Sequence, residues 1–265
     1  MPNIEIPDII KSASDAAQDN LPATMQQTDG ALSTVVGFFN NVVLYPVKKA
    51  NLTFRYKLEA FEDDLKEKTK HIPPENLQIP PTMIAGPALE ALRYTYDEKE
   101  LREMYENLLA SAMDSRLVSQ AHPSFVDTIK QMSPLDARLI EIIASNRQFA
   151  CANIQFSIVN EGTYYVKGMP NYFVEELANF SDPFDVSTSL HNLVRLGLID
   201  ISEATLNNYN YQSLKTHPYV LSQLEVFKQF GKKIEVKLNE LVIRINNYGE
   251  CFAQVCLEKE KNNAD

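Results

Sequence analysis

The sequence predicts a mainly α-helical protein, with an N-terminal helical module over residues 31–132 and a C-terminal winged-helix-like α+β module with a small β-hairpin over residues 133–260. Three observations support this fold class. Apolar residues recur at intervals of three and four through most of the first module, as on one side of a helix. From residue 133 on, helical stretches are joined by short alternating runs that are typical of strands. The 265-residue chain is 45% hydrophobic, so it can bury a sizeable core.

The first module follows a leader. Residues 1–30 are rich in polar residues and interrupted by prolines, so we expect them to be weakly ordered. The segment Leu32 to Val43 has helical spacing and ends before Pro46. A second helix is expected before Pro73, and a third is expected to begin at Pro80 and Pro81. The apolar positions of these two helices are Phe54, Leu58, Phe61 and Leu65, and then Ile84, Ala88, Leu89 and Leu92.

The most regular apolar stripe of the chain lies in the helix expected after residue 97. Asp97 and Glu100 are spaced as in a capping box, which predicts that Asp97 caps the first turn. Glu103 and Glu106 lie on the side opposite the stripe, so we expect both carboxylates to be exposed to solvent. The stripe consists of Leu101, Met104, Tyr105, Leu108, Leu109 and Ala112.

Two helix starts mark the junction between the modules. Ser124, which follows Pro123, is expected to cap a short helix. Ser133 and Pro134 are typical of an N-cap and a first helical position, and this helix should run to about Asn146.

The second module is predicted to alternate helices and strands. Pro170 and Pro183 each indicate the start of a helix. The helix from Pro183 should end near Gly197, which suits a left-handed C-cap, and a strand should begin directly after it. We interpret residues 203–230 as an insertion that is itself helical around residues 219–227.

The hairpin is expected between residues 234 and 245. Ile234, Val236 and Leu238 alternate with polar residues, Asn239 and Glu240 can form a turn, and the following apolar residues can run back. A last helix is expected to carry Tyr248, Phe252, Val255 and Cys256. Three helices followed by a hairpin and a final helix outline a winged-helix-like domain.

Composition limits the classes of function. With 25 basic and 35 acidic residues, the net charge of -10 disfavours a protein that coats nucleic acid. Only 3 cysteines are present, so no dense disulfide framework is expected. The start of the chain lacks the basic and apolar runs of a signal peptide, and its longest apolar stretch is shorter than a membrane span. We therefore expect a soluble cytoplasmic protein.

No motif indicates catalysis, and we expect the protein not to be an enzyme. Phosphate-binding glycine loops and nucleophile elbows are absent from the sequence. The histidines are too far apart in the chain to form a metal-binding pair of the usual spacing. Accordingly we predict no catalytic, cofactor-binding or metal-binding residues, and no cofactor.

One surface is a candidate for binding nucleic acid or a protein partner. On the helix from Pro183, the core side is expected to hold Leu190, Leu193, Val194 and Gly197. The opposite side holds Thr188, His191, Asn192 and Arg195, and the hairpin would add a positive wing of Lys232, Lys233, Lys237 and Arg244. A winged helix can read DNA with such a helix or dock a protein. Asp182 and Asp185 at the helix start would repel phosphate, so a protein partner is favoured and DNA stays an alternative.

Membrane association is a further alternative. The apolar side of the Leu32 to Val43 segment includes Phe38 and Phe39, but its polar side carries no charge. Interfacial membrane helices usually place basic residues on the polar side. A core or partner-binding helix is therefore the favoured interpretation of this segment.

Several motifs of the sequence run from Ile72 to Leu77, from Leu101 to Asp114, from Ala121 to Phe125, from Ser133 to Ala137, from Leu193 to Ile199 and from Tyr248 to Phe252, with Pro80 between the first two. Together these motifs make the chain resemble the abortive infection alpha family. The resemblance covers roughly residues 30–258. It implies a bacterial or prophage defence protein of the abortive-infection type and implies no catalytic residues. We expect such a protein to act through protein–protein interaction.

Overall fold

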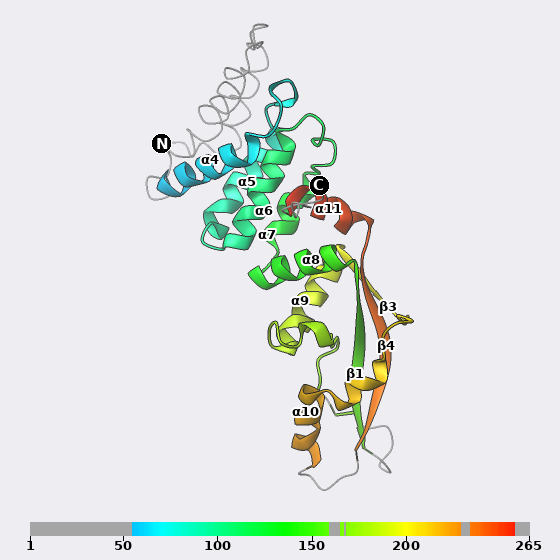
Figure 1. The fold of residues 1–265 in the computed structure, drawn as a ribbon. Helices are drawn as coiled ribbons and strands as arrows, with labels where there is room; N and C mark the ends of the chain where they lie inside the picture. The colour runs from blue at the N-terminus through cyan, green and yellow to red at the C-terminus, as the bar shows by residue number, and fades with distance from the viewer. Residues whose placement is uncertain (1–54, 159–164, 167, 229–233, 258–265) are drawn as a thin grey trace. The chain divides into compact units, whose positions relative to one another are not determined.

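The structure is a computed structural model, and it describes residues 55–158, 165–166, 168–228 and 234–257 (Figure 1). The chain divides into two compact units. The first comprises the described residues up to 134 together with those from 251 on, and the second comprises residues 135–250. The expected leader over residues 1–30 and the expected helix from Leu32 to Val43 lie outside the described residues.

The first unit is a bundle of helices. It contains α4 (Arg55–Thr69), the 3-10 turn η2 (Pro74–Asn76), α5 (Thr82–Thr95), α6 (Lys99–Ala112), α7 (Ser124–Lys130) and the last turns of α11 (Asn247–Cys256). Helix α6 contacts α4, α5 and α7. Its predicted apolar stripe is confirmed as core, since each of those six side chains is at most 3% exposed.

The predicted caps in this unit are wrong. Asp97 lies outside α6, and its carboxylate pairs with the ammonium of Lys57 at 2.6 Å. The N-cap residue is Glu98, whose side chain makes no capping hydrogen bond. Ser124 is the first residue of α7, and its hydroxyl lies 2.6 Å from Nδ1 of His122. The N-cap position falls one residue after Asp97 in α6 and one residue before Ser124 in α7, so neither expected residue occupies it.

The second unit combines helices with an antiparallel sheet. Its elements are α8 (Pro134–Asn146), β1 (Gln148–Ile158), β2 (Tyr165–Val166), η3 (Glu175–Leu177), α9 (Pro183–Arg195), β3 (Ile199–Ser202), η4 (Tyr211–Thr216), α10 (Pro218–Lys228), β4 (Ile234–Ile245) and the start of α11. The strand order is β2-β1-β4-β3, and all neighbours are antiparallel. The protein is thus mainly helical with a small antiparallel sheet, as predicted at this level.

The predicted hairpin within residues 234–245 is wrong, because β4 is one continuous strand. Asn239 and Glu240 stay in the ladder and pair with Asn153 and Ala152 of β1. Strand β1, which the sequence analysis did not identify, pairs with β4 along its whole length (Figure 1). The dipeptide Asn-Glu also lacks the glycine that favours a two-residue turn, so an extended partner determines its conformation.

The helix and strand around Gly197 agree with the prediction. Gly197 has φ 73°, which is the left-handed conformation expected at the end of α9, and β3 begins at Ile199. The helix predicted around residues 219–227 is confirmed as α10. Pro170, however, begins no α-helix. The residues after it form a bridge between Phe173 and Ala152 and then the short turn η3.

The insertion covers one face of the long β1–β4 ribbon. Its buried side chains, including Tyr211, Leu214 and Val220, pack in one cluster with Ile154 and Phe156 of β1. The hydroxyl of Tyr211 donates to the backbone oxygen of Leu241 in β4 at 3.0 Å. The insertion therefore contributes to the core of the second unit.

Candidate functional site

The predicted interaction side of α9 lies on the surface of the second unit. Asp182 caps the helix by accepting from the amide of Phe184 at 2.8 Å, and Pro183 occupies the first position. Leu190 and Leu193, on the inner side of the helix, are fully buried. The opposite side of α9 carries Thr188, His191, Asn192 and Arg195; Asn192 is partly buried and the other three are exposed. The structure thus brings these four predicted residues together on one side of α9.

The side chains of Asn192 and Arg195 are held by hydrogen bonds. The amide of Asn192 donates to Oδ2 of Asp136, in α8, at 2.9 Å. Its oxygen accepts from Nε and Nη2 of Arg195 at 3.0 and 2.8 Å. The guanidinium is therefore held against the helix in a defined position, with Asn192 between it and α8.

His191 is also held in place. Its Nδ1 lies 2.7 Å from the backbone oxygen of Ser187. Since a carbonyl oxygen only accepts, Nδ1 carries the proton and Nε2 faces Asn171 as an acceptor at 3.5 Å. The ring lies over Tyr172 with a centroid separation of 4.5 Å. An aromatic pair therefore forms the middle of this surface.

Apolar side chains extend the surface in a way that the sequence analysis missed. Phe184 is 41% exposed and lies four residues before Thr188, so it continues the same stripe. Val194, predicted to be in the core, is 38% exposed. Phe180 is exposed to the same extent. The Cζ atom of the Arg138 guanidinium lies 5.3 Å from the centroid of the Phe180 ring. Extending the stripe back by one turn from Thr188 would have identified Phe184.

The predicted positive wing is not assembled on β4. Lys237 and Arg244 are both exposed, but they lie seven residues apart in a continuous strand. An odd separation places their side chains on opposite faces of the sheet, about 23 Å apart along the strand. Lys232 and Lys233 lie outside the described residues.

A second cluster of charged residues lies in the first unit, around Glu106. The prediction that Glu106 is exposed is wrong, since its side chain is 3% exposed. Its carboxylate lies 3.9 Å from Nζ of Lys68 in α4 and 3.5 Å from Nε of Arg102 in α6. Neither distance is that of a short hydrogen bond, and Oε1 has no hydrogen-bond partner within the described part of the chain. Glu103, by contrast, is 38% exposed.

Burial governs the charge of Glu106. Burial, and to a lesser extent the nearby carboxylate of Asp64, raises the pKa of this carboxyl to about 7. The positive charges of Lys68 and Arg102 act in the opposite direction but do not offset the burial. Near neutral pH, the Glu106 carboxyl, which is buried between α4 and α6, is therefore protonated in a part of the molecules and ionised in the rest.

A family model named abortive infection alpha matches residues 53–256. The chain belongs to this family. The match spans both compact units, so it includes the α9 surface and the cluster around Glu106. Membership in the family indicates a defence role of the abortive-infection type.

Further comparisons add no relative to the family match. No curated protein and no solved structure gives a significant match to the chain. Within the described ranges, no helix has both the length and the apolar character needed to cross a membrane. Across those same residues, no group of three or more histidine, cysteine or acidic side chains is arranged to hold a metal ion.

Proposed function

We propose that this family member is a bacterial or prophage antiphage defence protein that acts by binding a protein partner and not by catalysis. The observation that supports the proposal is the outward surface of α9, where Phe184, His191 and Arg195 form one stripe next to Tyr172. Aromatic residues and arginine supply most of the binding energy in protein–protein interfaces. Here His191 and Arg195 are also held by contacts within the unit, which lowers the entropy lost on binding.

A winged-helix-like module is the architecture that we propose for this surface. Its support is the chain order of α8, β1, α9, β3 and β4, with β4 paired between β1 and β3. In helix-turn-helix modules that bind DNA, one recognition helix makes the contacts to the bases. In this chain the corresponding helix is α9.

DNA binding is the alternative that the same architecture allows, and charge argues against it. Asp182 and Asp185 lie at the start of α9, where a DNA-reading helix approaches phosphate. Of the expected wing, Lys237 and Arg244 lie on opposite faces of β4. The guanidinium of Arg195 is engaged by Asn192 at 2.8 Å, so reading a base would first require that contact to break. A membrane-associated effector would depend on residues 32–43, outside the described part of the chain.

Site-specific photo-crosslinking in cells during phage infection tests the proposal. A benzophenone side chain at position 184 should yield an adduct with protein, because this position lies in the proposed interface. The matched control is position 221 in α10, where Leu221 is 40% exposed, close to the 41% of Phe184. The adduct at 184 should be lost when Arg195→Ala is added. Equal adducts at both positions would contradict the proposal, and adducts with DNA would support the winged-helix regulator instead.

A further inference from the structure

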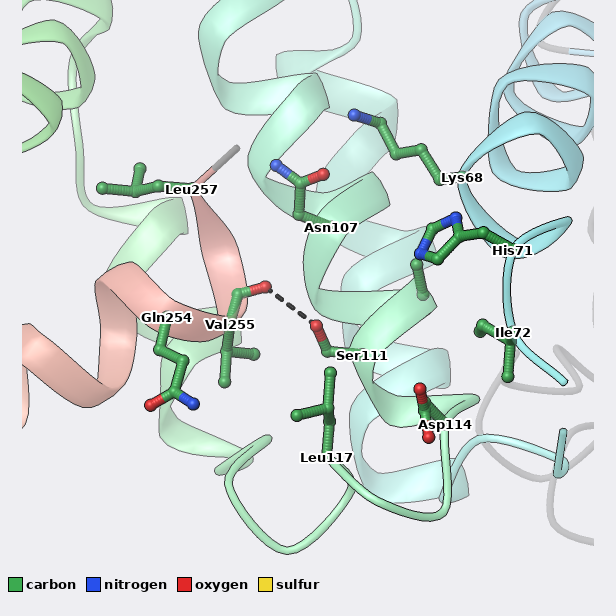
Figure 2. A pocket seen from close by; sticks show the side chains of 11 residues that line it. Lys68, His71, Ile72, Asn107, Ser111, Asp114, Leu117, Gln254, Val255 and Leu257 are labelled. Carbon is green, nitrogen blue, oxygen red and sulfur yellow. Dashed lines mark hydrogen bonds between the residues drawn. The ribbon is translucent and has the colours of Figure 1, made fainter. Parts of the chain in front are cut away.

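A pocket of about 340 Å³ lies within the first unit, where α4, α6 and α11 all end. Figure 2 shows Lys68 and His71 on the α4 side, Gln254 and Val255 on the α11 side, and Asn107 and Ser111 of α6 between them. The volume is at the small end of the range for sites that bind small organic molecules.

Two nitrogen-bearing side chains line this pocket. They are the ammonium of Lys68, which lies 3.9 Å from the carboxylate of Glu106, and the imidazole of His71. The carboxylate of Asp114 also lines the pocket, but both of its oxygens accept from the guanidinium of Arg116, at 2.6 to 3.2 Å. This hydrogen bonding lowers the pKa of Asp114 and neutralises its charge locally. No open carboxylate among the described lining residues is therefore left to attract a cation.

Three carbonyls near the ends of α6 and α11 accept hydrogen bonds from side chains in and beside the walls. Ser111 donates its hydroxyl to the oxygen of Val255 at 3.1 Å, and Asn107 donates to the oxygen of Cys256 at 3.0 Å. Gln78 donates to the oxygen of Ala112 at 3.2 Å. These bonds occupy carbonyls that would otherwise favour a cation at the ends of α6 and α11.

The remaining wall is apolar. Ile72 follows α4, Leu117 follows α6, and Val255 and Leu257 come from the end of α11. A ligand that fits must therefore carry an apolar body in addition to a charged group.

We propose that this pocket binds a small organic anion, with its charged group at Lys68 and His71 and its apolar body against Ile72, Leu117 and Val255. The proposal goes beyond partner binding by α9 and does not depend on it, because every residue involved belongs to the first unit. An abortive-infection protein with such a site can respond to a small molecule as well as to a protein.

The position of Glu106 next to Lys68 predicts a pattern of variant affinities that a nonspecific binding site would not show. Its carboxylate lies 3.9 Å from Nζ of Lys68 and competes with a bound anion for the same charge. Replacing Glu106 with glutamine removes this competition and keeps the shape of the side chain. Binding should therefore weaken when Lys68 is neutralised and tighten when Glu106 is neutralised.

The test is a titration of the full-length protein followed by nuclear magnetic resonance of backbone amides. Benzoate and benzenesulfonate serve as probes, since both carry an apolar ring and keep one negative charge at neutral pH. The two probes distinguish a planar carboxylate from a tetrahedral head group. Benzyl alcohol is the uncharged control. We expect the anions to shift the amides of Asn107, Ser111 and Val255, and benzyl alcohol to bind at least about tenfold more weakly, since one lost charge contact of roughly 1.4 kcal/mol is a factor of ten.

Matched variants separate binding from folding. Lys68→Gln should raise the Kd of both anions about tenfold, whereas Lys66→Gln should not change it, because Lys66 lies on the same helix and pairs with Glu62 at 2.9 Å. Glu106→Gln should lower the Kd severalfold. Leu117→Trp keeps every charge but fills the pocket, so it should abolish binding while thermal melting confirms that the protein is folded. Binding to Leu117→Trp as tight as to the parent, or equal effects of Lys66→Gln and Lys68→Gln, would overturn the proposal.

Discussion

Helices α6 and α9 have the same amphipathic pattern but very different surroundings. On α6 the apolar stripe is buried, and Glu106 on its polar side is buried as well, because α4 packs there. On α9 the apolar side is buried against its own unit, while the polar side from Phe184 to Arg195 faces solvent. Helical periodicity therefore locates the core side of a helix, but the number of packing neighbours decides whether the other side is a surface. In this comparison α6 maintains the fold, and α9 carries the exposed side that we propose as the interface.

The largest expected effect comes from the apolar side of α6. Leu108 is fully buried, so Leu108→Ala should lower the free energy of unfolding by about 2–5 kcal/mol through lost burial and a residual cavity. This is a large share of the stability of a typical domain, and phage protection should fall with the amount of folded protein. Glu103→Ala, on the exposed side, should change the unfolding free energy by less than about 0.5 kcal/mol. Chemical denaturation of both variants measures the difference, and equal effects would show that α6 is not central.

The buried carboxylate of α6 gives a pH-dependent effect. The pKa of Glu106 is raised to about 7 in the folded protein from an ordinary value of 4.5. The folded state therefore holds a proton that the unfolded state releases, and this contribution to stability is lost as pH rises from about 5 to above 7. Glu106→Gln should remove this loss and stabilise the protein at pH 8 by up to about 3 kcal/mol relative to the parent, with little change at pH 5. Denaturation at both pH values measures it, and a stability difference independent of pH would contradict the buried site.

The starts of α6 and α9 differ in whether an aspartate side chain caps the helix. Asp182 accepts from the amide of Phe184, so Asp182→Ala should lower the free energy of unfolding by about 1 kcal/mol. Asp97 had the better capping pattern in the sequence but only pairs with Lys57 on the surface, so Asp97→Ala should cost less than Asp182→Ala. Thermal melting of the two variants decides whether the structure or the pattern locates the cap. A larger loss for Asp97→Ala would contradict the structure.

Local signals in the sequence predicted much of the fold. The apolar stripe of α6, the helix from Pro183 and the left-handed end at Gly197 depend on neighbouring residues, and all were predicted correctly. Strand β4 was not, because its extended course across Asn239 and Glu240 is determined by pairing with β1, which is distant in the chain. The burial of Glu106 was missed for the same reason, since α4 covers it.

The candidate site was predicted in part. The spacing of Thr188, His191, Asn192 and Arg195 was enough to place them on one side of α9. Their contacts were not predictable, because Tyr172 and Asp136 approach from other elements. The positive wing depended on a turn that does not form, so Lys237 and Arg244 lie on opposite faces of the sheet.

Phage protection by a surface variant of α9 tests the central claim most directly. Phe184→Ser removes an aromatic ring that is 41% exposed, so the free energy of unfolding should fall by only about 1 kcal/mol, less than for a buried phenylalanine. Loss of a binding hot spot of about 2 kcal/mol weakens an interface roughly thirtyfold, and protection measured by plaque counts should fall accordingly. Leu221→Ser, of equal exposure on α10, should protect like the parent. If both variants are folded and Phe184→Ser protects as well as Leu221→Ser, α9 is not the surface through which this protein acts.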